Sequence, residues 1–112
     1  MFGQLFSAAG SRRQTFEALV RHVAAASVDA VRSLVIDRAI GMGPTEARGY
    51  IRGRGGREVR KQSRLALSRH AEADPAWETL LAQRAADRVA AMMLRELATV
   101  VVRSGATSRR VG

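Results

Sequence analysis

The residues best suited to chemistry in this sequence are basic, and they are concentrated in its middle third. Between Arg48 and Arg69 the chain carries eight basic residues and one acid, Glu58. The planar guanidinium group of arginine matches the geometry of phosphate groups and stacks on nucleobases, and a local excess of positive charge attracts anions from a distance. We therefore expect this segment, the arginine-rich ridge (residues 48–69), to contact an anionic partner.

The charge of the whole chain is distributed unevenly. Residues 41–70 hold eight basic and two acidic residues, whereas residues 71–112 hold six basic and five acidic residues. Lys61 is the only lysine among the 19 basic residues. A GC-rich genome also explains this bias, because the arginines outside the ridge share it. The position of the charge is therefore more informative than the choice of arginine.

Nucleic acid, either DNA or RNA, is the partner that this pattern favours most. We expect seven cations and one aromatic ring suited to stacking on a base to contact it: Arg48, Tyr50, Arg52, Arg54, Arg57, Arg60, Lys61 and Arg64. The main alternative is a helical adaptor or structural subunit whose basic face docks an acidic protein within an assembly. An anionic membrane surface and a merely solvated face are the remaining alternatives.

Patterns for catalysis or metal binding are weak. His70-Ala71-Glu72 matches part of the H-x-E element of zinc deaminases, but that site needs cysteine ligands and the chain has none. His70, Glu72 and Asp74 alternate along the chain, so a helix would not bring them together. Glu58 replaces the last glycine of a G-x-G-x-x-G pattern. We therefore expect a non-catalytic protein with no cofactor and no metal.

Helices must position the ridge. Ser11 and Gln14 form a capping-box pattern, which predicts that a first helix begins at Ser11 and runs to about Ile40. Its expected buried stripe consists of Phe16, Val20, Val23, Ser27, Val31 and Leu34. Gly41 and Gly43 end this helix. A second helix begins at Pro44, with Glu46 favourable in its first turn.

Three glycines predict a break inside the ridge. Gly53, Gly55 and Gly56 each weaken a helix by about 1 kcal/mol relative to alanine, so the second helix should be short and a hinge should follow. The sequence from Arg52 to Arg57 resembles the RGG segments of disordered RNA-binding tails. A single copy between helical segments nevertheless favours an interhelical turn, and a helix-turn-helix is a further alternative.

A third helix is expected from about Arg57 to Ala73. Arg57, Arg60, Lys61 and Arg64 would share one face of it, opposite Val59, Ala66 and His70. A fourth helix is expected to begin at Asp74 as cap and Pro75 as first residue, and to reach about Arg103. The expected fold is therefore all-α: a small bundle of three long helices and one short helix, with a glycine-rich hinge.

The last predicted helix carries a seam of alternating four and three spacing: Ala86, Ala90, Met93, Leu97 and Val100. This spacing suits an ordinary packing face within the bundle as well as a helix seam between chains. Together with the apolar patch of Val100, Val101 and Val102, it leads us to expect a homo-oligomer with the five seam residues at its interface. The chain of 112 residues should form an N-terminal arm (1–10), one helical domain (11–103) and a flexible tail (104–112).

The first sixteen residues could also act as a targeting segment, because Arg12 and Arg13 precede an apolar stretch. Glu17, Arg21 and His22 interrupt that stretch, which favours a helix start instead. No run approaches the roughly 20 apolar residues that span a bilayer. We expect a cytoplasmic protein that does not insert stably into membranes.

Overall fold

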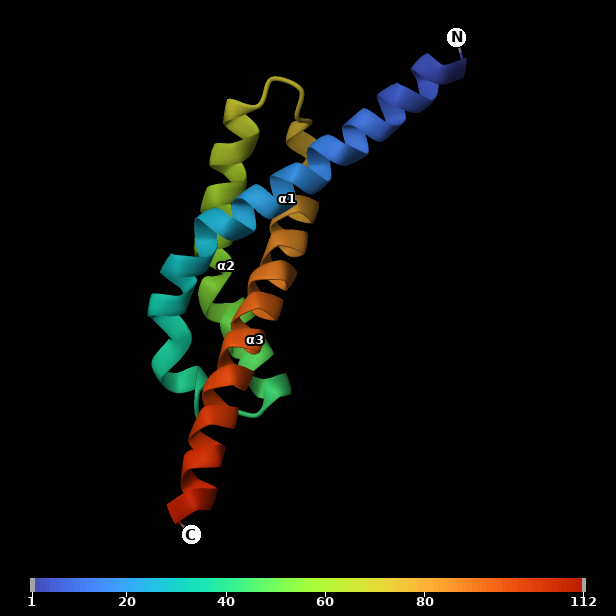
Figure 1. Cartoon of the computed structure of the whole chain (residues 1–112). Coiled ribbons are helices and arrows are strands. Elements are labelled where there is room, and N and C mark those ends of the chain that lie inside the picture. Colours follow the sequence, from blue (N-terminus) through green and yellow to red (C-terminus); the bar gives the residue numbers. More distant parts are fainter. Residues whose placement is uncertain (1, 112) are drawn as a thin grey trace.

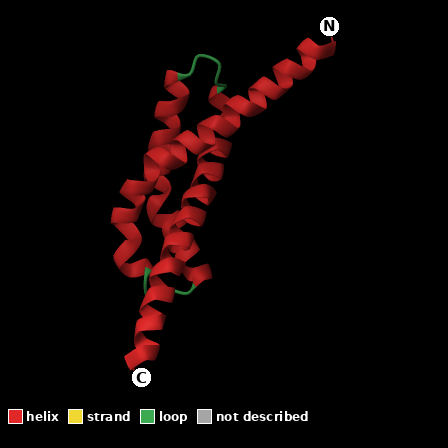
Figure 2. Ribbon diagram, viewed as in Figure 1, coloured by secondary structure: helices red, strands yellow, loops and turns green. Residues whose placement is uncertain are grey.

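The chain folds into three long α-helices. The computed structural model describes residues 2–111, and it describes side chains for residues 10–100 and for Val102. Helices α1 (Phe2–Ala39), α2 (Pro44–Arg69) and α3 (Glu78–Val111) follow one another, with a short 3-10 helix, η1 (Pro75–Trp77), before α3. Residues 2–111 contain no strand (Figure 2). The prediction of an all-α bundle is confirmed.

Each helix packs against the other two, and α2 runs antiparallel to α1 and α3 (Figure 1). The first turns of α1 and the last turns of α3 extend beyond the bundle at opposite ends (Figure 1). The molecule is consequently long and narrow, measuring 69 × 28 × 19 Å along its principal axes. Within residues 2–111, no helix combines the length and apolarity needed to cross a membrane.

Helix α2 is continuous through its glycines, so the predictions of a hinge and of a separate short helix are wrong. The backbone of residues 44–69 is helical throughout, and no described glycine has a positive φ. Gly55 is buried where α1 approaches α2, and a Cβ atom there would lie 2.8 Å from Cγ1 of Val31. Tertiary packing therefore outweighs the low helix propensity of glycine.

The core between α1 and α2 uses every fourth residue. The buried positions are Val23, Ser27, Val31, Val35 and Ala39 on α1, and Ala47, Ile51, Gly55, Val59 and Ser63 on α2. A spacing of four exceeds the helical repeat of about 3.6, so each stripe rotates by about 40° per step and the helices wind around each other. For this reason Val35 is buried, while Leu34, which was predicted to be in the core, is 48% exposed.

The hydroxyl groups of the two buried serines are both hydrogen-bonded. Ser27 Oγ donates to the carbonyl oxygen of Val23 at 2.7 Å, and Ser63 Oγ donates to that of Val59 at 2.8 Å. Each bond stays within its own helix, because a serine side chain can reach the carbonyl one turn earlier. The serines can therefore act as small residues that let α1 and α2 approach closely.

The end of α1 at Ala39 and the start of α2 at Pro44 follow the predicted signals, whereas the other helix boundaries differ. Gly43 precedes α2, Pro44 opens it and Glu46 lies in its first turn. Asp74 caps η1, where its Oδ1 accepts a hydrogen bond from the Ala76 amide at 2.9 Å. The next long helix begins only at Glu78. His70 is the residue at the C-terminal end of α2, and its amide donates to the Leu67 carbonyl at 3.4 Å.

The predicted start of the first helix at Ser11 is also wrong, because α1 begins at Phe2. The Ser11 carbonyl instead accepts a hydrogen bond from Thr15 Oγ1, one turn further along the same helix. The backbone is helical through residues 2–10 and 104–111. The division into an arm, a domain and a tail, and a targeting role for residues 1–16, stay predictions.

Two contacts tie α1 to the C-terminal half of the chain. Arg32 donates from Nε to Glu96 Oε2 at 2.8 Å and from Nη2 to Glu96 Oε1 at 2.5 Å. These hydrogen bonds lower the pKa of Glu96 and raise that of Arg32. Phe16 meets Trp77 of η1 edge to face, with ring centroids 5.5 Å apart. Together they fix the register of α1 along α3.

The predicted oligomer seam on α3 lies largely inside the monomer. Ala90, Met93 and Leu97 belong to the core, whereas Ala86 is half-buried and Val100 is 38% exposed. Three of the five residues are therefore used for packing within the chain and are not available to a second chain in this arrangement.

Candidate nucleic-acid interface

All eight residues predicted to bind nucleic acid lie on the single helix α2. Its buried side, which includes Ile51 and Val59, packs against α1 and α3. The seven cations are exposed, and Tyr50 is half-buried. The ridge thus follows one continuous helix and covers its exposed sides, because α2 has no hinge.

Three of these cations are paired with acids of α3. Arg52 Nη1 lies 2.6 Å from Asp87 Oδ1, although the contact lacks the alignment of a hydrogen bond and is therefore an ion pair. Arg48 Nη2 lies 3.8 Å from the same oxygen. Arg64 Nε donates to Glu78 Oε1 at 2.8 Å. Intramolecular carboxylates thus partly neutralise one flank of the ridge.

The other four cations form the unpaired face of the ridge: Arg54, Arg57, Arg60 and Lys61. None of them lies within 4.0 Å of a carboxylate among the side chains that the structure describes. Glu58, the one acid within the ridge, instead accepts a hydrogen bond from Gln62 Nε2 at 3.0 Å. None of the four cations is therefore neutralised by an ion pair with a described carboxylate.

The geometry of this face suits a charged chain. At about 100° per residue, Arg54, Arg57 and Lys61 fall within about 60° of one another on the helix. They extend about 10 Å along its axis, at about 1.5 Å per residue. A line of cations on a rigid helix can contact successive phosphates of one strand without ordering a loop first.

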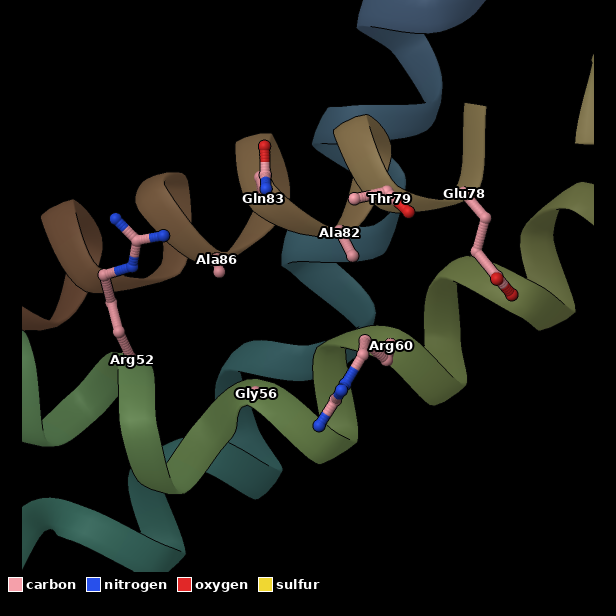
Figure 3. A pocket seen from close by; sticks show the side chains of 8 residues that line it. All are labelled: Arg52, Gly56, Arg60, Glu78, Thr79, Ala82, Gln83 and Ala86. Atoms are coloured by element: carbon pink, nitrogen blue, oxygen red, sulfur yellow. The ribbon is translucent and has the colours of Figure 1, made fainter. Parts of the chain in front are cut away.

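A groove of about 330 Å³ separates α2 from α3 beside the ridge. Figure 3 shows small residues at its base, Gly56 on α2 and Ala82 and Ala86 on α3. Arg52 reaches across it toward α3, whereas the guanidinium of Arg60 is directed away from α3 (Figure 3). Both arginines line the groove, but their guanidinium groups point in different directions.

Sequence reasoning missed two residues of α1 that adjoin the ridge. Leu34 and Arg38 line hollows shared with Tyr50 and Arg54 of α2. Leu34 was predicted to be in the core, and Arg38 lies outside the basic segment. No local signal could have assigned them, because their position depends on how α1 winds around α2.

No protein-family model, no curated protein and no solved structure matches this chain. A functional assignment therefore rests on the chemistry of the ridge.

Proposed function

We propose that this protein is a small, non-catalytic helical module that binds nucleic acid through the unpaired face of α2. The observation that carries this proposal is that Arg54, Arg57, Arg60 and Lys61 are exposed on one rigid helix with no carboxylate within 4.0 Å among the described side chains. Cations without internal partners are free to replace the counterions of a phosphate backbone.

The ion pairs to α3 set the expected strength of this electrostatic attraction. If only the four unpaired cations contact phosphates, log affinity for duplex DNA should fall with log salt at a slope of about −3.6. That slope corresponds to a roughly 150-fold loss of affinity between about 50 and 200 mM salt. If all seven cations of the ridge took part, the slope would be about −6. A salt series therefore counts the contacts.

The test is fluorescence anisotropy with labelled mixed-sequence oligonucleotides, single-stranded and duplex, across a salt series. A triple variant, Arg54→Gln/Arg57→Gln/Lys61→Gln, should lose most of the affinity and most of the slope. The matched control removes the same charge from α3: Arg84→Gln/Arg88→Gln/Arg95→Gln. These three arginines are exposed and also have no carboxylate within 4.0 Å among the described residues.

Two outcomes would contradict the proposal. If the wild-type protein binds no oligonucleotide at about 50 mM salt, nucleic acid is not the partner. Retention by an acidic polypeptide such as polyglutamate under the same conditions would then favour docking to an acidic protein. If both triple variants weaken binding equally, net charge alone is responsible and the ridge is not the site.

A further inference from the structure

A trough runs between α1 and the unpaired face of α2. Two hollows, of about 320 and 470 Å³, share Leu34 and Arg54 and so adjoin each other. Arg38 and Tyr50 line the first hollow, and Arg57 and Arg60 line the second. We call this feature the α1–α2 trough; it is bordered by α1, whereas the groove described above is bordered by α3, and Arg60 lines both.

The trough is positively charged. Its four arginines, Arg38, Arg54, Arg57 and Arg60, have no carboxylate within 4.0 Å among the described side chains. Two acids also line it, Asp37 in the first hollow and Glu58 in the second. Four cations against two acids leave a net attraction for an anion, and the anion gains one contact, Arg38, that the ridge lacks.

The trough also offers apolar surface among these cations. Leu34 is 48% exposed at the point that both hollows share. Tyr50 is half-buried and packs against the core, so its ring is held in place while part of it lines the trough. Apolar surface within a cationic trough attracts a ligand that is both charged and flat.

We propose that the α1–α2 trough binds single-stranded nucleic acid, with an unpaired base against Tyr50 and Leu34 and adjoining phosphates on Arg38, Arg54 and Arg57. This inference rests on the proposed function and narrows its ligand. Single strands expose base faces that stack on aromatic side chains while the backbone follows a cationic groove. A duplex hides those faces between its own base pairs, so it could use the cations of the trough but not its apolar surface.

Substitution of Tyr50 tests the base contact. Tyr50→Leu keeps an apolar side chain against the core but removes the ring, whereas Tyr50→Phe keeps the ring. The probes are oligo(dT), oligo(U) and a mixed-sequence duplex. Tyr50→Leu should weaken binding of the single strands by roughly 5- to 150-fold, as the loss of base stacking does elsewhere, and change duplex binding less than about twofold. Tyr50→Phe should bind like the wild type.

Substitution of Arg38 tests the trough without touching the core. Arg38→Gln should reduce the salt slope for single strands by about 0.7, the value for one phosphate contact. Arg84→Gln removes one exposed charge from α3, outside the trough, and should leave the slope unchanged. Circular dichroism would reveal whether Tyr50→Leu fails to fold. If it does, the comparison of Arg38→Gln with Arg84→Gln still tests whether single strands bind in the trough. A difference between oligo(dT) and oligo(U) would identify a role for the 2′-hydroxyl.

The outcomes separate this inference from the proposed function. If the wild-type protein binds single strands and duplex equally, and neither Tyr50→Leu nor Arg38→Gln changes single-strand binding, the trough is not the site although nucleic-acid binding stands. If Arg38→Gln and Arg84→Gln lower the slope equally, the trough has no special role. If the wild-type protein binds no probe at about 50 mM salt, both proposals fail.

Discussion

Two glycines of α2, two residues apart, should respond to alanine in opposite ways. At Gly53 an added Cβ atom would have no heavy atom within 4 Å, apart from atoms of its chain neighbours and of the nearby backbone of α2. At Gly55 the added Cβ would lie 2.8 Å from Cγ1 and 3.0 Å from Cγ2 of Val31. Carbon atoms normally meet at about 3.5–4.0 Å, so the second substitution forces the two helices apart or strains Val31.

The magnitudes follow from two opposing effects. Replacing glycine by alanine within a helix stabilises it by about 0.5–1 kcal/mol, and this gain is common to both sites. Overpacking a core costs about 1–3 kcal/mol. The Val31 side chain cannot readily move away from the new Cβ atom, because it is fully buried and a β-branched side chain in a helix has one strongly preferred rotamer. We expect Gly53→Ala to be more stable than the wild type, and Gly55→Ala to be about 1–3 kcal/mol less stable than Gly53→Ala.

Urea unfolding followed by circular dichroism at 222 nm measures this difference. With a denaturant dependence of about 2 kcal/mol per M, a difference of 2 kcal/mol separates the two midpoints by about 1 M. Val31→Ala should partly rescue Gly55→Ala, because it removes both methyl groups that the new Cβ meets. The double-mutant cycle should therefore show a favourable coupling of at least about 0.5 kcal/mol.

Equal stability of Gly55→Ala and Gly53→Ala would contradict this expectation. That result would mean that α1 and α2 do not approach as closely as the structure shows. A destabilising Gly53→Ala would point to a different error, namely that α2 breaks near Gly53 in solution, as the glycine content alone predicts.

Three further changes test other contacts. Asp87→Asn should release two arginines of α2 from their ion pairs, which should strengthen nucleic-acid binding and steepen the duplex salt slope by up to about 2. The control Glu72→Gln should change neither the affinity nor the slope, and fluorescence anisotropy measures both. The pKa of Glu96 is lowered on folding by its arginine partner, so its stabilisation is complete above its unfolded pKa near 4.5 and is lost as the pH falls through the lower folded value. The difference in urea midpoint between the wild type and Glu96→Gln should therefore shrink below about pH 4.5, and a constant difference would contradict the pair. Phe16→Ala should shift the emission of Trp77, the single tryptophan, to longer wavelength, and an unchanged spectrum would mean that the two rings do not pack in solution.

The start of α2 and the exposure of the ridge could be predicted because their signals are local. Pro44 fits only the first turn of a helix, and Glu46 is favoured there by the helix dipole. The cations of the ridge face water because charged side chains stay solvated, while apolar residues such as Ile51 and Val59 take the buried side of the helix. Such features require no knowledge of what the helix packs against.

The hinge was a wrong prediction because the effect of a glycine depends on its surroundings. Helix propensity counts Gly53 and Gly55 as equivalent, yet only Gly55 lies against α1. The core stripe of α1 was predicted wrongly for the same reason. Whether Leu34 or Val35 is buried depends on how α1 winds around α2, which the sequence of α1 alone does not show. The pairing of Arg52 with Asp87 likewise depends on the register of α2 along α3.

The helix ends that extend beyond the bundle have a consequence for measurements of size. The radius of gyration is 17.8 Å, whereas a compact chain of this length would have about 13 Å. A radius of 17.8 Å is that of a compact protein of about 240 residues, roughly twice this chain. On a gel-filtration column the monomer should elute close to the position of a globular dimer. Its assembly state must therefore be determined by mass, for example by light scattering or native mass spectrometry, and not by elution volume.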